Sequence, residues 1–503
     1  MASRKDQLNA YNFARKRTVA AFIQPSPTGS EEGAPRPLRA VGPSLVVGAL
    51  ALAVVGALGL IQPGAPSGWD KVGAYVIVGS DSTTRYVVLQ EKSPDGKMEP
   101  KELHPVLNFA SAKLLLDPDQ GQVIKVKESV LDNGTVPHGA TVGIPYAPDR
   151  LPSAKDAGTP KKWAVCDRPG RDGSAPDQAV FVLADQDAGK ASQRMRLTGN
   201  QVLYVQDEDG GAQYLVDARG TRFELGGPDW KSREPTKMSQ LRQTLFGQSA
   251  KPRPVSDAWL KSLNQGSPLW FPTIDHQGEK TADGTVGDVE EATSAAGQAL
   301  YVVGEHGMES ITPFTALLVR EWTGQVAHDR IPVPAGAGTF AGTSPDWPVQ
   351  EPKAISTARG AHSGPVECSV LAGTANAQGR PQLNVWAGEN YPATIVDGAT
   401  SAYVTPGTGL LYVEVTGKDT RNGTLYLVTD TGLRYAVPRN NDSTATATPA
   451  PTATTSGTDT INQAQLKLGY GSVTPKGIPL EWSSFLPKGP TLDTESARQA
   501  QGS

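Results

Sequence analysis

The sequence predicts an α+β, β-rich protein that a single helix holds on a membrane. Three observations predict this class: residues 41–61 contain no charged side chain, short aromatic and β-branched strands end at glycine turns, and Gly and Pro are abundant. Abundant Gly and Pro are typical of chains with many turns and modest helix content. We expect one transmembrane helix and an extracytoplasmic domain of four small repeats around a central β core, propeller-like and pseudo-symmetric.

The uncharged run at 41–61 is long enough to cross a bilayer. At about 1.5 Å of rise per residue it spans roughly 31 Å, which matches a hydrocarbon core of about 30 Å. A cleaved signal peptide, with Ala65 and Ser67 near the cleavage site, is one alternative, but such peptides have apolar regions of about 7 to 15 residues. A buried core helix is the other alternative, and it would normally carry a polar stripe. We therefore expect an uncleaved anchor.

The basic residues beside the anchor predict its orientation. Seven precede it, namely Arg4, Lys5, Arg15, Lys16, Arg17, Arg36 and Arg39. The first thirty residues after it contain only Lys71 and Arg85. Because Lys and Arg near a spanning helix stay in the cytoplasm, we expect a single-pass membrane protein with a cytoplasmic N-terminus and most of the chain outside.

The segment before the anchor, residues 1–40, is predicted to contain a basic amphipathic helix and a flexible linker at 24–37. Apolar residues recur at helical spacing among basic ones. Tyr11, Arg15, Lys16 and Arg17 are the predicted contacts with membrane lipid or a cytosolic partner. A solvated helix that only sets topology is the alternative.

A short pattern recurs four times after the anchor. It begins at Tyr86, Tyr214, Tyr301 and Tyr426, and a glycine follows the last three tyrosines six residues later, at Gly220, Gly307 and Gly432. Each copy predicts a hairpin with a glycine turn, although unrelated hairpins in a β-rich chain are the alternative. In two copies, at 103–116 and 308–319, the sequence also predicts a short Ala/Leu-rich helix after a strand. We divide a domain at 70–438 into repeats near 70–120, 195–250, 290–325 and 402–438, with a core around 121–190 and 355–400.

Both cysteines, Cys166 and Cys368, follow the anchor. Oxidising compartments favour pairing, so we expect a disulfide, with two separate thiols as the alternative. It would close a loop of 368 − 166 = 202 residues, which the chain-entropy model values at about 5 kcal/mol.

The C-terminal region has two parts. Residues 439–460 are rich in Ser, Thr, Ala and Pro and predict a linker, because no side chain there is suited to a packed core. The tail at 461–503 regains apolar residues at Ile478, Trp482 and Leu486. We expect these residues to pack against another surface.

Residues for catalysis, cofactors or metals are not grouped in the sequence. No Gly-Lys pair is part of a P-loop, and G-x-S-x-G is absent. The six histidines, among them His328 and His362, form no pair at metal-ligand spacing. The net charge of −4 disfavours a nucleic-acid partner. We expect a protein that is not an enzyme and has no cofactor or metal.

Several segments together resemble the EccB family of type VII (ESX) secretion systems of actinobacteria. They are Gln7–Arg17, Leu103–Asn108, Ala110–Leu114, Val142–Pro145, Trp163–Cys166, Cys368, Ile478–Leu480, Trp482 and Leu486–Pro490. The resemblance covers nearly the full length. The threonine-rich stretch before the tail departs from the common pattern of the family.

The resemblance implies a structural subunit of the secretion machine. In that family a cytosolic N-terminal helix and one membrane span join the inner-membrane secretion complex, which contains the EccC motor ATPase, EccD and EccE. The exported parts contact other copies of EccB and the mycosin protease MycP. The repeats look like a cell-wall-binding unit, so peptidoglycan binding is an alternative function. Family members are also labelled ATPases, although this sequence has no phosphate-binding loop.

Overall fold

The computed structural model describes residues 3–23, 38–61, 64–93, 95–118, 120–170, 175–191, 196–294, 297–324, 332, 334–355, 366–375, 379–395, 401–417, 423–438 and 463–501. The predicted linkers at 24–37 and 439–460, and the histidines His328 and His362, lie outside these residues. The chain forms two units, Met1–Ser67 and Gly68–Ser503. We call them the helical segment and the main body and describe each by itself.

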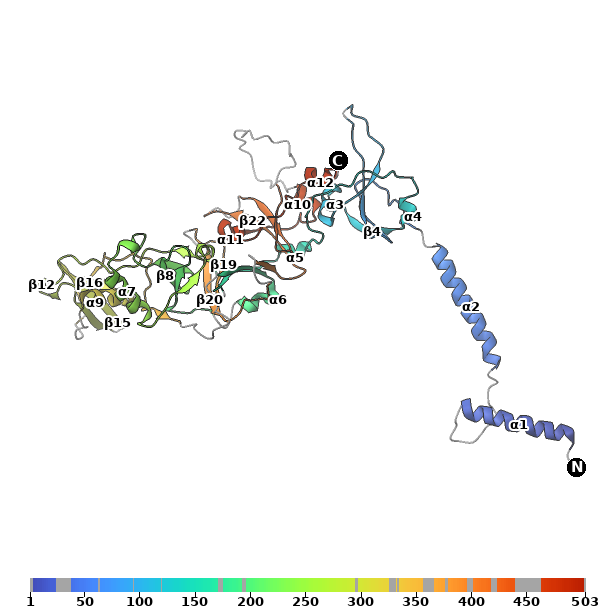
Figure 1. Cartoon of the computed structure of the whole chain (residues 1–503), viewed down its shortest axis with the longest axis horizontal. Coiled ribbons are helices and arrows are strands. Elements are labelled where there is room, and N and C mark those ends of the chain that lie inside the picture. The colour runs from blue at the N-terminus through green and yellow to red at the C-terminus, as the bar shows by residue number, and fades with distance from the viewer. Residues whose placement is uncertain are drawn as a thin grey trace. The chain divides into compact units, whose positions relative to one another are not determined.

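The helical segment consists of α1 (Arg4–Ile23) and α2 (Leu38–Ile61) (Figure 1). The helix α2 covers the whole uncharged run, which confirms that this run is helical. In the described part of the chain, no helix combines the length and the apolar character that crossing a membrane requires. The single-pass anchor therefore stays a prediction.

The helix α1 does not have the separated faces of an amphipathic helix. Leu8, Tyr11 and Phe22 are exposed by 62%, 67% and 91%. At 3.6 residues per turn, Arg15 lies on the same side as Leu8, whereas Phe13 lies about 140° away from it. Apolar and basic side chains are thus mixed around the helix. The helical spacing of the apolar residues predicted an apolar face, but Arg15 interrupts that face.

Three sheets in the main body share one topology, in which three antiparallel strands and a helix are followed by a fourth strand parallel to the first. Module 1 has β1 (Tyr75–Gly79), β2 (Arg85–Leu89), β3 (Glu102–Pro105), α3 (Phe109–Leu115) and β4 (Gln122–Val126). Module 2 has β7 (Gln201–Asp207), β8 (Gln213–Asp217), β9 (Thr221–Glu224), α7 (Pro235–Phe246) and β10 (Arg253–Val255). Module 4 has β22 (Leu410–Val415), β23 (Leu425–Val428), β24 (Arg434–Ala436), α10 (Gln463–Lys467) and β25 (Lys476–Pro479).

Module 3 has a different fourth strand. It contains β14 (Val289–Ser294), β15 (Gly297–Gly304), β16 (Gly307–Ile311), α9 (Pro313–Thr323) and β17 (Gly338–Thr339). Here β17 pairs in parallel with β16, the third strand, rather than with the first. Two further short strands, β12 (Lys280–Thr281) and β13 (Gly284–Thr285), form a separate hairpin before it.

The hairpins form where the sequence pattern predicts them. Each motif tyrosine lies on the second strand of its sheet. Gly220 and Gly432 have φ of +75° and +79° in the turns that follow, where a Cβ would be strained. In modules 1 and 3, the N-cap side chains of Asn108 and Thr312 accept hydrogen bonds from the first turns of α3 and α9. The helices that follow these strands are therefore confirmed.

The fourth strands lie beyond the predicted ends of the repeats. They are β4, β10, β17 and β25, which follow residues 120, 250, 325 and 438. The prediction ended each repeat at its hairpin or helix, because a parallel strand that returns after a helix has no local sequence signal. Whether the four modules are arranged around a pseudo-symmetry axis stays a prediction.

The core sheet has the strand order β20-β19-β5-β6-β21. Its strands are β5 (Lys162–Arg168), β6 (Asp177–Leu183), β19 (Val366–Gly373), β20 (Gln382–Gly388) and β21 (Ser401–Val404). These strands lie mostly within the predicted core regions, whereas residues 122–126 of those regions belong to module 1. The short elements α5 (Ala154–Gly158), α6 (Asp185–Ala188) and η3 (Gly189–Ala191) flank it.

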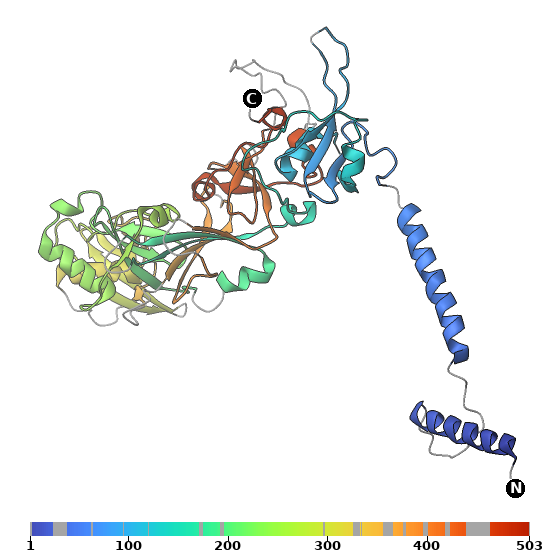
Figure 2. The same cartoon turned by 45° about the vertical axis from the view of Figure 1, so that its right-hand side comes forward.

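The modules share hydrophobic cores. Modules 1 and 4 and the C-terminal tail contribute to one cluster, which includes Val76, Leu411 and Leu492. Two C-terminal helices, α10 and α12 (Thr494–Arg498), lie beside α3 of module 1 (Figures 1 and 2). Modules 2 and 3 share another cluster, in which α7 packs on α9. The chain therefore brings its last residues back to its first sheet.

Short elements connect module 2 to its surroundings. The strands β11 (Asn264–Gln265) and β18 (Lys353–Ala354) pair in parallel with β9 and β7, so the chain that enters and leaves module 3 extends the sheet of module 2. The 3-10 helix η4 (Trp230–Ser232) precedes α7. Three short helices follow the fourth strands of modules 1, 2 and 4, namely α4 (Glu128–Leu131), α8 (Asp257–Lys261) and α11 (Leu480–Ser484).

Candidate functional site

The described residues contain no group of three or more His, Cys, Asp or Glu side chains that is arranged to hold a metal ion. His104 is almost buried, and its Nδ1 lies 2.9 Å from the carbonyl oxygen of Ala140. His276 lies beside Glu279 and Glu305, and the hydrogen bond with Glu279 is the main cause that raises the pKa of this histidine. These contacts give both histidines structural partners, and the larger buried polar groups lie in the joints between the modules.

The disulfide lies at the middle of the core sheet. Cys166 on β5 and Cys368 on β19 are directly opposed in the antiparallel pair and are bonded to each other. Both are buried in an apolar cluster with Phe181 and Trp386. The predicted pairing is therefore present, and it joins strands that are 202 residues apart in the sequence.

The neighbours of the cysteines point to the opposite face of the core sheet, because successive side chains of a strand alternate. These neighbours are Asp167 and Glu367, which are also directly opposed and are both 0% exposed. Module 2 covers them: Arg253 forms an ion pair with Glu367, and the backbone N–H of Ser256 donates to Asp167 over 2.6 Å. Burial raises the pKa of Asp167 to about 7 and that of Glu367 to about 8.

The rest of the contact between module 2 and the core sheet is mostly apolar. Trp259 on α8 is fully buried in a cluster that also contains Trp163 of the core sheet. The hydroxyl groups of Ser262 and Ser369 form a hydrogen bond beside them. The short helix α8 therefore fixes module 2 to the core through one large side chain and a row of polar contacts.

Module 4 is fixed by an analogous tryptophan and a different polar network. Trp482 on α11 is fully buried in the same cluster as Trp163. The Arg434 guanidinium donates to Glu414 and to Ser483, each over 2.6 Å, and to the carbonyl oxygen of Leu486 over 3.1 Å. These contacts hold the tail on the sheet, which confirms that Trp482 and Leu486 pack inside the protein.

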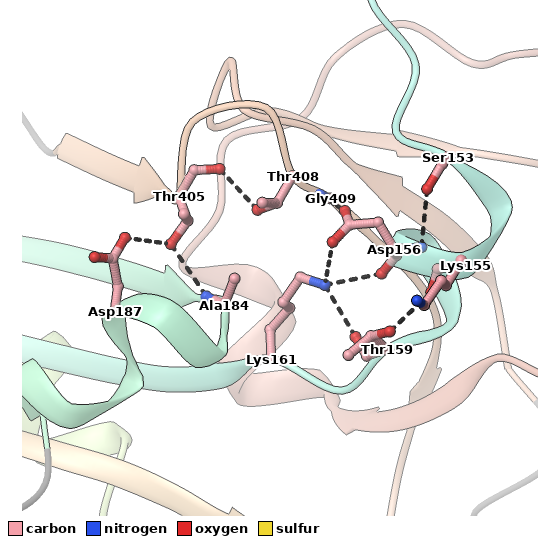
Figure 3. Close-up of polar contacts among 10 residues, drawn as sticks. All are labelled: Ser153, Lys155, Asp156, Thr159, Lys161, Ala184, Asp187, Thr405, Thr408 and Gly409. Carbon is pink, nitrogen blue, oxygen red and sulfur yellow. Dashed lines mark hydrogen bonds and ion pairs between the residues drawn. The ribbon is translucent and has the colours of Figure 1, made fainter.

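A second network joins α5 and the start of the core sheet to the loop between β21 and β22 (Figure 3). The fully buried Lys161 ammonium lies 3.0 Å from Asp156 Oδ1 and also donates to the carbonyl oxygens of Asp156 and Thr159. Asp156 Oδ2 accepts from the backbone N–H of Gly409 over 2.7 Å. Each Lys161 proton thus has an acceptor, and the carboxylate joins two parts of the chain 253 residues apart.

The same loop is attached to the end of β6. The Thr405 hydroxyl donates to Asp187 over 2.9 Å and accepts from the backbone N–H of Ala184 over 3.0 Å (Figure 3). The hydrogen bond from Lys190 is the main cause that lowers the pKa of Asp187, and the bond from Thr405 adds to it. These contacts fasten module 4 to the core sheet at a second place.

The predicted site residues lie in separate places. Tyr11, Arg15, Lys16 and Arg17 are exposed on α1. The motif tyrosines lie within the sheets, and Tyr301 and Tyr426 are only 8% and 7% exposed. Sequence reasoning missed Asp167 and Glu367, although both stand next to a cysteine that it singled out. Two acidic residues beside paired cysteines could have indicated a buried polar contact.

The sequence of residues 1–503 matches the family described as "Type VII secretion system ESX-1, transport TM domain B". The chain belongs to the EccB family. The ESX-3 secretion system ATPase EccB3 of Mycolicibacterium smegmatis is 26% identical over 454 residues, which are 82% of this chain and 78% of that protein. The ESX-1 secretion system ATPase EccB1 of Mycobacterium tuberculosis is 24% identical over 98% of this chain and 94% of its own length.

Solved structures show that this EccB chain has the fold of other EccB proteins. An ESX-5 inner membrane complex contains a chain that matches 100% of this one with a TM-score of 0.60 and 22% identity. A structure titled as the EccB3 dimer from the ESX-3 core complex matches 84% of this chain with a TM-score of 0.56 and 21% identity. EccB is thus a component of ESX inner membrane complexes, and this agrees with the role of a structural subunit.

Proposed function

We propose that this EccB chain is a non-catalytic scaffold that organises the extracytoplasmic side of an ESX inner-membrane complex. The observation that carries the proposal is the set of contacts that join modules 2 and 4 to the core sheet in the main body. The disulfide joins two strands of the core sheet, Trp259 and Trp482 pack modules 2 and 4 against that sheet, and the polar contacts Arg253–Glu367 and Asp156–Gly409 add to the two joints. Such a body keeps its surfaces in fixed positions, as a scaffold must.

The helix α2 is the proposed membrane anchor. Its support is the absence of charged residues in 41–61, a length close to the thickness of a bilayer, and the excess of basic residues before it. The N-terminus is then cytoplasmic, and the main body is extracytoplasmic. An oxidising compartment is also where the Cys166–Cys368 bond is stable.

Accessibility of introduced cysteines tests this topology. Because the described cysteines are paired, a thiol at position 146, where Tyr146 is 89% exposed, reacts selectively. In intact cells a membrane-impermeant maleimide should label Tyr146→Cys and should not label Tyr11→Cys. Lysed cells, in which both positions must react, are the control. Protection of position 146 in intact cells would refute the anchor.

The proposed partners are the EccC motor ATPase, EccD, EccE, further EccB copies and MycP. The exposed mixture of apolar and basic side chains on α1 supports a cytosolic contact with protein or with anionic lipid. A tagged full-length chain, solubilised in detergent and purified, should bring the other secretion subunits with it. Purification of the chain alone would remove the basis of the scaffold proposal.

Charge reversal separates the role of α1 from that of the main body. We expect Arg15→Glu to reduce copurification of the cytosolic partners. Lys97→Glu is the control: it makes the same change of charge on a side chain that is 85% exposed in the main body, and it should not reduce copurification. Equal effects of both variants would show that α1 has no specific contact.

ATP hydrolysis is the second candidate function, because relatives carry the name ATPase. The chain has no P-loop to support it. Phosphate release by the purified chain, freed of the motor subunit, decides between the two. Turnover above background that the chain itself produces would establish the enzyme. Peptidoglycan binding through the motif tyrosines has less support, because Tyr301 and Tyr426 are buried in their sheets.

A further inference from the structure

The opposed carboxylates Asp167 and Glu367 are too close to be ionised together without cost. Side chains that face each other across antiparallel strands have Cβ atoms about 4.5 to 5.5 Å apart. Both side chains are fully buried, and one guanidinium, that of Arg253, forms an ion pair with Glu367. Two carboxylates and one guanidinium have a net charge of −1, whereas one bound proton makes the group neutral.

Hydrogen bonds do little to stabilise the doubly ionised form. The backbone N–H of Ser256 reaches one oxygen of Asp167. Among the described residues, the other Asp167 oxygen has no hydrogen-bond donor, and the contacts of Glu367 with Arg253 and with its own backbone N–H each lower its pKa less than burial raises it. A buried carboxylate that lacks donors is unfavourable in its ionised form.

The charged groups around the pair add negative rather than positive charge. Glu208, which follows β7, and Asp177 on β6 both favour the protonated form of Asp167. Asp177 is in turn paired with Arg168 over 3.0 Å. The phenol of Tyr391 lies near the same carboxylates, and burial raises the pKa of this phenol, so it stays neutral. In the described part of the chain, the ion pair that reaches this pair of carboxylates joins Arg253 to Glu367.

We propose that Asp167 and Glu367 form a proton-binding site that holds one proton at neutral pH, and that release of this proton weakens the contact between module 2 and the core sheet. The contact is sensitive because both partners from module 2 lie in the four residues that lead into α8. Arg253 is on β10, and Ser256 is the N-cap of α8. A net negative charge here weakens the attachment of the segment that carries Trp259 to the core sheet.

The direction of the pH effect follows from the raised pKa values. A carboxyl group with a pKa raised on folding stabilises the fold fully below its unfolded value, near 4, and this stabilisation is lost as the pH rises through the folded value. For Asp167 and Glu367 the folded values are about 7 and about 8. The stabilisation should therefore fall as the pH rises from about 4 toward about 8.

Unfolding of the purified full-length chain across this pH range tests the proposal. We expect the unfolding midpoint of the wild type to decrease as the pH is raised from about 6 to about 9. Glu367→Gln, which imitates the protonated acid, should lose most of this pH dependence. The matched control is Glu414→Gln, in the buried ion pair of Arg434, and it should keep the wild-type slope. Parallel curves for the wild type and Glu367→Gln would overturn the proposal.

Two measurements on the wild type decide the matter even where a variant fails to fold. The infrared carbonyl band of a buried carboxylic acid should be present at neutral pH and should disappear as the pH rises. Hydrogen exchange of the α8 amides, corrected for its intrinsic pH dependence, should accelerate over the same interval, while that of α11 should not. Absence of the acid band at neutral pH would show that both groups are ionised and would refute the site.

Discussion

Modules 2 and 4 solve the same packing problem with different polar chemistry. Each ends in a strand parallel to its first strand and a five-residue helix that buries a tryptophan, Trp259 or Trp482, in the cluster around Trp163. In module 4 the buried Arg434 has three acceptors for its N–H groups. In module 2 the Arg253 guanidinium is in ion-pair contact with one of two opposed carboxylates.

The difference shows which part of a joint is interchangeable. A large apolar side chain on a short helix serves both joints, because apolar burial is nondirectional and depends mainly on area. The polar part is directional, and its balance of charge decides how the joint responds to pH. Module 4 should therefore be insensitive to pH over the range in which module 2 weakens.

The largest loss of stability should come from breaking the disulfide of the core sheet, on which both modules pack. Replacing Cys166 and Cys368 together by Ser removes a bond that closes 202 residues, and about 5 kcal/mol of the free energy of unfolding should be lost. Denaturant unfolding of the oxidised wild type and the double variant measures it. A variant as stable as the wild type would show that packing alone holds the core sheet together.

The two tryptophans come next. Trp259→Ala and Trp482→Ala should each lower the free energy of unfolding by about 3 to 5 kcal/mol, because each empties a fully buried position. Limited proteolysis distinguishes the joints, since loss of Trp482 should expose the tail and loss of Trp259 should expose α8. Leu480→Ala, at a side chain that is 40% exposed on α11, is the control and should have little effect.

The buried ion pair of module 4 should have a somewhat smaller effect. Arg434→Met removes the partner of Glu414 and two contacts to the tail, and we expect a loss of about 3 kcal/mol. Adding Glu414→Gln to this variant should restore part of the stability, because the unpaired charge is then removed. A double variant less stable than the single one would contradict this account.

The smallest effect distinguishes the starts of the two helices. Ser256 caps α8 by accepting from the backbone N–H of Trp259, whereas Pro479 caps α11 without a side-chain hydrogen bond. Ser256→Ala should therefore cost about 1 kcal/mol. Pro479→Ala should leave the cap of α11 unchanged. Chemical denaturation of both variants checks the difference, and equal losses would show that the caps do not distinguish the joints.

Local patterns in the sequence predicted the parts of the fold that form between neighbouring residues. The alternating strand and glycine turn around Tyr214 and Gly220 became β8 and β9. The segment after Asn108 became α3, with Asn108 as its cap. These elements are decided within about ten residues, where spacing and turn chemistry act directly.

The joints could not be predicted in this way. Arg253 pairs with Glu367 and Asp156 reaches Gly409 across more than a hundred residues. The tail strand β25 completes a sheet whose other strands end at Ala436. Neither charge, spacing nor hydropathy along the chain identifies the partner of such a residue.

The sequence alone determined the uncharged helix, the hairpins, the pair of cysteines and membership of the EccB family, since each depends on the order of neighbouring residues or on the type of residue. The tertiary structure decided which strand completes each module and which carboxylates share a buried face. The physical reason is that parallel pairing and burial of charge depend on distance in space, which the order of residues does not give until the chain is folded.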